Sequence, residues 1–308
     1  MNEGARTTSE AGGALAAAAL DLVDRPRSLS DDAWHDLRRN PVFWAAAAVA
    51  VLMILLALAP QWFSATDART ADCSLANSLQ PPSASHWFGF DKQGCDVYAR
   101  VVYGARSSIL VGVFSTALAG IVALLVGMLA GFFRGWVDAV LARLIDIVLG
   151  IPLLLGAIVV AKALATQDAG IGPVVLALGL LGWTTAARIV RSSVIAARDQ
   201  DYVQAARMLG ASNSRLMVRH ILPNALAPTI VVLTIALGTF IALEATLSFL
   251  GVGPKHTISW GADIAEAQRW IREGAYPLLF PAGFLTATVL AFITLGDAIR
   301  EAFDPRLR

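Results

Sequence analysis

Charged side chains are scarce in this sequence of 308 residues. Aspartate, glutamate, lysine and arginine make up 15% of it, and hydrophobic residues make up 56%. Soluble domains usually carry about 25% charged residues, because they need a charged exterior. The formal net charge is +1, so bulk electrostatics gives no reason to expect nucleic acid as a partner. We therefore expect lipid to cover much of this protein's surface.

Motifs for nucleotide binding and for common hydrolytic chemistry are also missing. No Gly-x-x-x-x-Gly-Lys-Ser/Thr phosphate loop occurs, and none of the three lysines follows a glycine. The sequence contains no Gly-x-Ser-x-Gly, His-Glu-x-x-His or Cys-x-x-Cys pattern. The histidines are scattered, without the spacing of metal ligands. We therefore expect no catalytic residue, cofactor or metal site here, and any nucleotide must be bound by another polypeptide.

What the sequence does have is long apolar runs. A helix needs roughly 20 predominantly apolar residues to cross a bilayer. These runs show no alternation with a period of two, which argues against membrane strands. We predict an all-α polytopic membrane protein with six transmembrane helices. The runs cover residues 42–59, 107–133, 144–161, 169–187, 225–250 and 275–296.

The positions of lysine and arginine predict the orientation of these spans. With the N-terminus inside, 16 of the 24 basic residues fall in cytoplasmic segments, 7 fall outside, and Lys162 lies at a helix edge. This predicts a multi-pass protein of the cell (inner or plasma) membrane with both termini cytoplasmic. The predicted parts are a tail (1–40), a first span (41–60), an outer loop (61–106), a core region with five spans and the connection at about 191–223 (107–296), and a second tail (297–308).

The first of these parts carries no predicted span. Its short run from Ala14 to Leu20 lacks the length and the basic flank of a signal peptide. We expect a cytoplasmic tail with a helix from Ser30 to Arg39 on the membrane surface. The outer loop carries both cysteines, Cys73 and Cys95. In an oxidising compartment they can pair, and the alternative is two free thiols.

One long connection, at about 191–223, separates the fourth and fifth runs. Connections between helices of a bundle usually take a few residues, so this one is expected to form structure of its own. Its small residues allow a partner's backbone to come close, and its arginines share one face if the helix is continuous. Pro223 is expected to end the segment, and Pro228 to bend the next span. The candidate contact residues are Gln204, Ala205, Ala206, Arg207, Gly210, Arg215, Arg219 and Pro223.

This connection resembles that of a known family. Gln204-Ala-Ala, followed by Gly210 and Ile221-Leu-Pro223, resembles the EAA loop of ABC importer permeases, whose short helix docks into a groove of the ATPase subunit. The family usually has glutamate at the place of Gln204, so an ion pair made by that glutamate is not implied. The wider resemblance is to C-type permeases of dipeptide and oligopeptide importers. It is carried by the segments 86–91, 102–106, 146–152, 183–188, 244–251 and 304–308, which occur together in this order.

The resemblance implies a transmembrane domain of the type I ABC importer fold, with a cytoplasmic coupling helix. It implies a second homologous permease as partner, two ATP-binding subunits or one fused ATPase that bind ATP and Mg, and an extracytoplasmic substrate-binding protein. The implied cargo is a dipeptide or oligopeptide, and nickel chelates and haem are alternatives. Gly210 is the expected point of ATPase contact, and the alternative is that it only ends a helix.

Two ionisable residues lie within the apolar runs, where charge is costly and often functional. Asp146 is expected either to pair with Arg143 or Arg188 or to act as a gate contact. Glu244 lies near the outer end of its span, where it is expected to make a structural contact or to reach water on the substrate pathway. The second run also carries a small residue at every fourth position from Ser115 to Gly135, which is typical of close helix packing.

Two other classes of protein fit an apolar chain of this kind. A secondary transporter needs ion-coupling carboxylates and often shows an internal repeat, and no repeat is visible. A membrane-embedded enzyme of lipid or cell-wall metabolism needs a catalytic group, and none of the common motifs is present. Co-purification with an ATPase distinguishes an importer subunit from both.

Overall fold

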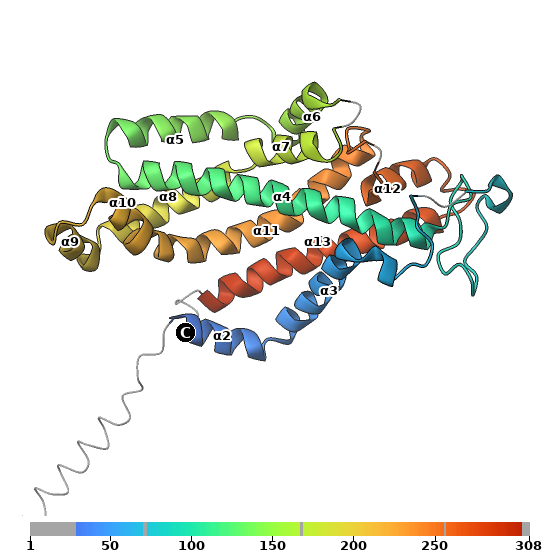
Figure 1. The fold of residues 1–308 in the computed structure, drawn as a ribbon, viewed down its shortest axis with the longest axis horizontal. Helices are drawn as coiled ribbons and strands as arrows, with labels where there is room; N and C mark the ends of the chain where they lie inside the picture. Colours follow the sequence, from blue (N-terminus) through green and yellow to red (C-terminus); the bar gives the residue numbers. More distant parts are fainter. Residues whose placement is uncertain (1–28, 70–72, 167–168, 256, 304–308) are drawn as a thin grey trace, which may run out of the picture.

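The computed structural model describes residues 29–69, 73–166, 169–255 and 257–303. Within these ranges the protein is an elongated bundle of helices without a β-strand (Figure 1). The helices are α2 (Leu29–Arg39), α3 (Pro41–Leu58), α4 (Val97–Phe132), α5 (Trp136–Leu149), α6 (Leu153–Leu164), α7 (Gly172–Leu181), α8 (Thr184–Arg198), α9 (Asp201–Met208), α10 (Asn213–Arg215), α11 (Leu222–Phe249), α12 (Trp260–Gln268) and α13 (Tyr276–Phe303). Short 3-10 turns η1 (Pro60–Trp62) and η2 (Leu75–Asn77) lie in the loop after α3, and a π-helical segment η3 (Leu216–Ile221) precedes α11.

Six membrane crossings are compatible with these helices. Four continuous helical stretches within the described residues are long and apolar enough to span a bilayer: α3, α4, the stretch from α10 to α11, and α13. Two further pairs pass the same test only together, α5 with α6 and α7 with α8. If each bent pair counts as one span, the total is six, the number that the apolar runs predict.

The bent pairs correct the prediction that the third and fourth runs are single helices. The axes of α5 and α6 differ by 87°, and those of α7 and α8 by 42°. Between α5 and α6 the chain passes through Gly150 and Pro152. Proline disfavours helical geometry in the residue before it and has no N–H of its own to donate, so the chain leaves the helix here and starts another.

Two predicted boundaries differ from the structure, and one predicted helix is found. Helix α4 begins at Val97, ten residues before the predicted start, because the Asp96 side chain accepts a hydrogen bond from the Ala99 backbone N–H and caps the helix. Helix α13 continues beyond residue 296 to Phe303, so the predicted C-terminal tail begins as helix. The predicted surface helix at 30–39 is found as α2.

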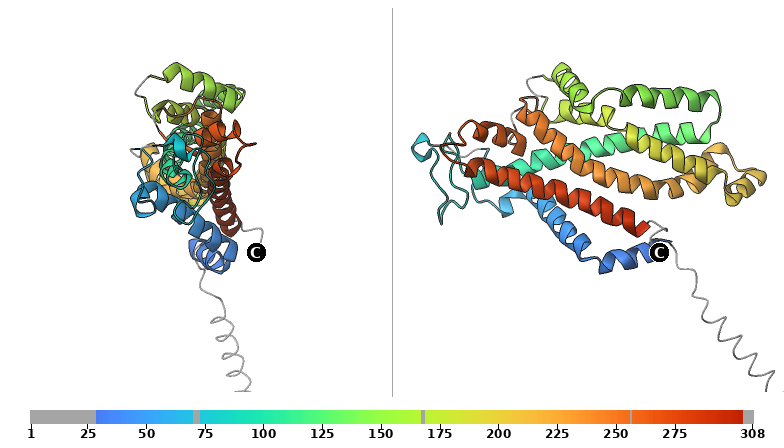
Figure 2. Two further views of the ribbon diagram at one scale, coloured as in Figure 1. Left: turned by 90° about the vertical axis from the view of Figure 1, so that its right-hand side faces the viewer. Right: turned by 180° about the vertical axis from the view of Figure 1, so that it is seen from behind.

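The bundle has two distinct ends, which we call the α12 end and the α9 end. The α12 end carries α12 and the loop from residue 59 to residue 96, and the α9 end carries α9 and α10 (Figures 1 and 2). Helix α13 ends toward the α9 end, where Leu37 of α2 packs against Ala298 and Ala302. The described parts of both chain termini therefore lie on the same side as the long connection.

Helix α4 organises the core, because it packs against α3, α7, α8 and α11. The predicted ladder of small residues is buried from Ser115 to Gly131, and only Gly135 lies outside the helix. A Cβ atom at Gly127 or Gly131 would come within 2.6 Å of Val190 or Val194 on α8. The ladder therefore serves packing within this chain, and it holds α8 against α4 at a distance that only glycine permits.

Candidate functional site

The long connection forms a compact structure at the α9 end. Helix α8 runs as far as Arg198, α9 follows after two residues, and a tight turn at Gly210 leads into α10. Gly210 has a φ of +84°. The Gly210 backbone N–H donates to the Arg207 carbonyl, and the Ala211 backbone N–H donates to the Ala206 carbonyl. This is the Schellman pattern of a helix C-terminus, in which glycine takes the left-handed position. Gly210 therefore ends α9, and its contact with an ATPase stays a prediction.

Buried side chains fix this structure to the bundle. Val203 of α9 and Leu216 and Ile221 of η3 are completely buried. They pack with Val190 and Val194 of α8 and with Met128 and Phe132 of α4 in one cluster. Arg198 donates to the backbone carbonyls of Gly131 and Phe132 and so holds the end of α8 to the end of α4. A force applied to α9 would be transmitted directly to α4, α8 and α11.

Two large apolar side chains project from the tip of this structure. Met208 is 83% exposed and Leu209 is 90% exposed. Sequence reasoning missed both, although an apolar pair directly before a helix-ending glycine is a signal that could have found them. Arg207, Arg215 and Arg219 are also exposed, as are Ala205 and Pro223, and Ala206 is half-buried. The tip thus presents two exposed apolar side chains with basic residues nearby. Gly210 is also open to solvent, since nothing lies within 4 Å of a Cβ atom placed there.

Gln204 makes a structural contact within the chain. Its side-chain amide Nε2 donates to the backbone carbonyl of Arg198 at 3.1 Å. This bond joins the first turn of α9 to the end of α8. A glutamate, which the related sequences usually carry, has no N–H to donate there.

The connection is not one continuous helix, which was the condition for its arginines to share a face. The turn at Gly210 and the Ser212 cap place Arg207 on α9 and Arg215 on α10. The expectation that Pro223 ends the segment is wrong, because Pro223 lies at the second position of α11, inside a helical stretch. The part from Asn213 onward instead continues into the fifth span.

The candidate gate residue Asp146 lies in an ion pair between two helices. Its Oδ1 accepts from Nη2 of Arg188 at 2.6 Å, and both side chains are about half exposed. One turn closer to the α9 end, Arg191 of α8 binds Asp138 of α5 with two bonds of 2.6 and 2.8 Å. These pairs connect α5 to α8, as the interpretation of Asp146 as a partner of Arg188 predicted.

Glu244 is completely buried, so the expectation that it reaches water is wrong in this conformation. The Ser248 hydroxyl donates to its Oε1 at 2.6 Å, and its Oε2 has no hydrogen-bond partner. It lies far along the chain from Asp146 and on a different helix, α11. The sequence-predicted residues therefore form separate sites rather than one.

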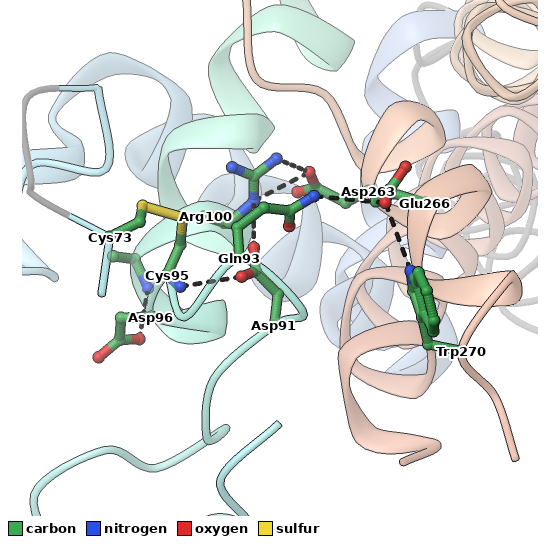
Figure 3. A network of polar contacts seen from close by, with 10 residues as sticks. Cys73, Asp91, Gln93, Cys95, Asp96, Arg100, Asp263, Glu266 and Trp270 are labelled. Carbon is green, nitrogen blue, oxygen red and sulfur yellow. Dashed lines mark hydrogen bonds and ion pairs between the residues drawn. A yellow bond between two sulfur atoms is a disulfide. The ribbon is translucent and has the colours of Figure 1, made fainter. Parts of the chain in front are cut away.

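The α12 end holds the disulfide and a network of charged groups (Figure 3). Cys73 and Cys95 are joined by a disulfide with a Cα–Cα distance of 4.5 Å. The Cys95 backbone N–H donates to Asp91, and Arg100 of α4 lies between Asp91, at 3.5 Å, and Asp263 of α12. Burial raises the pKa of Asp91 and of Asp263 above the ordinary value of an aspartate, against the opposing effect of Arg100.

This network lines a cavity of about 300 Å³ between the loop and α12. Lys92 closes one side of it: its ammonium lies 4.2 Å from the centroid of the Trp270 ring and 3.0 Å from a carboxylate oxygen of Glu273. The charges on this cavity are thus largely satisfied within the chain. Among the described residues, no group of three His, Cys, Asp or Glu side chains is placed to hold a metal ion.

Two family models match the chain. The one described as the binding-protein-dependent transport system inner membrane component matches residues 123–308, and the N-terminal TM domain of oligopeptide transport permease C matches residues 28–82. Among curated relatives, the oligopeptide transport system permease protein OppC of Bacillus subtilis (strain 168) is 36% identical, with 97% of each chain covered. The dipeptide transport system permease protein DppC of Alkalihalophilus pseudofirmus is also 36% identical, with 90% of each chain covered.

A solved structure shares the fold. The MetNI methionine ABC transporter in an inward-facing conformation matches with a TM-score of 0.50 and 21% identity, over 67% of this chain and 96% of that chain. The fold is therefore that of the transmembrane domain of type I ABC importers, as the resemblance implied.

Proposed function

The chain belongs to the family of binding-protein-dependent transport system inner membrane components, and we propose that it is one of two permease subunits of an ATP-driven importer of dipeptides or oligopeptides. The cargo is inferred from the relatives, which are named as oligopeptide and dipeptide permeases. ATP and Mg are bound by partner ATPase subunits, and the chain itself performs no catalysis. The family favours this function over a secondary transporter and over a membrane-embedded enzyme.

The observation that carries the proposal is the exposed tip at the α9 end. Met208 and Leu209 are the most exposed large apolar side chains among the described residues, and they lie at the end of the bundle where Arg207, Arg215 and Arg219 gather. A soluble partner with an apolar groove and an acidic rim fits this surface. Because α9 is packed on α4, α8 and α11, movement of the partner would change the relative positions of the spans.

The orientation is part of the same proposal. The α9 end, with both described termini, faces the cytoplasm and the ATPase, and the α12 end faces a substrate-binding protein outside. A second permease completes the translocation pathway.

Affinity purification of the tagged chain from its native membrane tests this function. An ATPase and a second permease should co-purify with the wild-type chain. Leu209→Asp should reduce the recovered ATPase at least tenfold, because a carboxylate would be buried in an apolar groove, while the second permease is retained.

Asn213→Asp is the matched control, since it adds the same charge at an exposed position a few residues away. It should retain the ATPase. Recovery of the chain alone, with no ATPase in any lipid or detergent, would contradict the importer function. Equal ATPase recovery with Leu209→Asp and with the control would exclude the tip as the docking surface.

A further inference from the structure

A second cavity at the α12 end has a different charge from the one beside Trp270. Its volume is about 360 Å³, and it lies between α4, the start of α7 and the segment before α12. Four of its lining residues come from one face of α4, at the helical spacing i, i+3, i+4 and i+7. The lining residues are Arg69, Tyr103, Arg106, Ser107, Leu110, Ile171, Thr257 and Ile258.

Two hydrogen-bond donors in this cavity have no partner. Arg106 is exposed, and the structure gives its guanidinium no hydrogen bond and no ion pair within the part of the chain that it describes. The Tyr103 hydroxyl, one turn away on the same face, makes no hydrogen bond there either. Arg69, by contrast, is held 3.1 Å from Asp67 and lies 5.3 Å from the Tyr103 ring centroid. None of the described residues that line the cavity is acidic, so none of them neutralises the positive charge of Arg106.

The wall opposite α4 is fixed in place. Gly104 lets the segment before α12 come close, since a Cβ atom there would lie 3.2 Å from the Trp260 side chain. The Trp260 indole N–H donates to the Val101 carbonyl at 2.8 Å, and Ser107 contacts Thr257 through their hydroxyls at 3.4 Å. The cavity is therefore preformed, with polar groups on two sides, rather than a gap left by mobile side chains.

We propose that this cavity binds the C-terminal carboxylate of a peptide. The identity of the ligand rests on the proposed function; the chemistry rests on the cavity alone. Arg106 offers a planar fork of N–H donors that matches the two oxygens of a carboxylate, and Tyr103 adds a hydroxyl donor. Every linear peptide with a free C-terminus carries such a carboxylate, so this contact recognises peptides without regard to their side chains.

The lining argues against a lipid headgroup as the occupant. Besides α4, the cavity is bounded by Ile171 of the α7 start and by Thr257 and Ile258, so its polar donors lie between walls from three parts of the chain and not on a flat lipid-facing surface. A headgroup phosphate would use the same donors, so the experiment compares the two ligands directly.

Arginine footprinting on the purified full-length chain, with the partners that accompany it, in lipid nanodiscs tests the assignment. Phenylglyoxal should modify Arg106, and millimolar dialanine should slow that reaction several-fold, as read by mass spectrometry of the peptides. Dialanine amide, which lacks the carboxylate, should give no protection. Tyr103→Phe should raise the half-protecting dialanine concentration about three- to tenfold through loss of one hydrogen bond.

Arg272 is the internal control, because it is exposed near the same end and does not line the cavity. Its modification should be unchanged by either peptide. Equal modification of Arg106 with and without dialanine would overturn the proposal. The proposal would also be overturned if inorganic phosphate protected Arg106 and dialanine then had no further effect. The same holds if replacing phosphatidylcholine by phosphatidylglycerol in the nanodisc protected Arg106 and dialanine added nothing. Footprinting requires no ATPase. A negative footprinting result would therefore leave the proposed importer function standing, and the co-purification result does not change how the footprinting result is interpreted.

Discussion

Arg100 is shared by two buried carboxylates, and this makes Asp91 sensitive to pH. Burial raises the pKa of Asp91 above its ordinary value, because the loop removes the carboxylate from water and the charge of Arg100 only partly compensates. In the pH window between the ordinary and the raised pKa, the folded state binds more protons than the unfolded state. The free energy of unfolding therefore increases as the pH falls through that window.

We predict that Asp91→Asn removes the contribution of Asp91 to this pH dependence and leaves that of Asp263, whose pKa is also raised by burial. The amide oxygen of asparagine can still accept the hydrogen bond from the Cys95 backbone N–H, which is 2.8 Å long in the wild type. Melting temperatures in nanodiscs, measured from pH 7 downward, should show the wild type gaining stability relative to the variant. Parallel curves for the two proteins would contradict the assigned direction.

Gln204 carries a second residue-scale prediction. Gln204→Glu restores the residue that the related permeases usually have, but it replaces the N–H donor to the Arg198 carbonyl by a carboxylate. We expect α9 to lose about 1 kcal/mol of local stability. Amide hydrogen exchange in α9 should then be about fivefold faster. Unchanged exchange would show that the hydrogen bond does not hold α9 in place.

These residues show what a sequence can and cannot predict at this scale. The small and basic residues at the α9 end were identified from composition and spacing, and Gln204 was added by the resemblance to the EAA loop. The role of Gly210 depends on its φ of +84°, which the spacing of small residues does not report. Met208 and Leu209 resemble core residues by type, and only the turn after them places them in the open.

At the scale of helices, the contact of α4 with α8 depends on glycine. A Cβ atom at Gly127 would lie 2.6 Å from the Val190 Cβ atom and 2.8 Å from the Ala187 carbonyl oxygen. Backbone atoms cannot give way as the end of a flexible side chain can. We predict that Gly127→Ala lowers the stability of the purified protein by about 1–3 kcal/mol, the usual cost of overpacking.

Gly283→Ala in α13 is the matched control, because nothing lies within 4 Å of a Cβ atom there. It removes a helix-interior glycine in the same way, so it should be neutral or slightly stabilising. The melting temperatures of the two variants in the same detergent provide the comparison. Equal values would mean that α4 and α8 are free to separate.

The helices also show where apolar runs stop being informative. The runs predicted six spans, which agrees with the structure if each bent pair counts as one span, because hydropathy measures how much apolar chain is available to cross a bilayer. Hydropathy does not measure the direction of the helix axis. The sequence therefore predicted one helix where α5 and α6 meet at 87°. The signal was present in Gly150 and Pro152, but a proline within a span is compatible with a mild kink as well as with a complete break.

At the scale of the whole molecule, the charge distribution and the fold agree on which segments lie together. The segments that hold most of the arginines, among them α2, α9 and α10, are gathered toward the α9 end of the bundle (Figure 2). The disulfide and α12 lie at the opposite end. By the positive-inside rule, this distribution predicts that the α9 end faces the cytoplasm.

Cysteine labelling in intact cells tests this orientation. Ser83 is exposed at the α12 end, and Ser214 is exposed at the α9 end. The two native cysteines are joined in a disulfide and do not compete for a thiol reagent. With an impermeant maleimide, Ser83→Cys should be labelled in intact cells, and Ser214→Cys only after the membrane is permeabilised. Because the two variants differ only in the end that carries the thiol, a difference in expression cannot imitate this result. Labelling of Ser214→Cys in intact cells, with Ser83→Cys protected, would place α9 outside and would leave no ATPase on its side of the membrane to contact it.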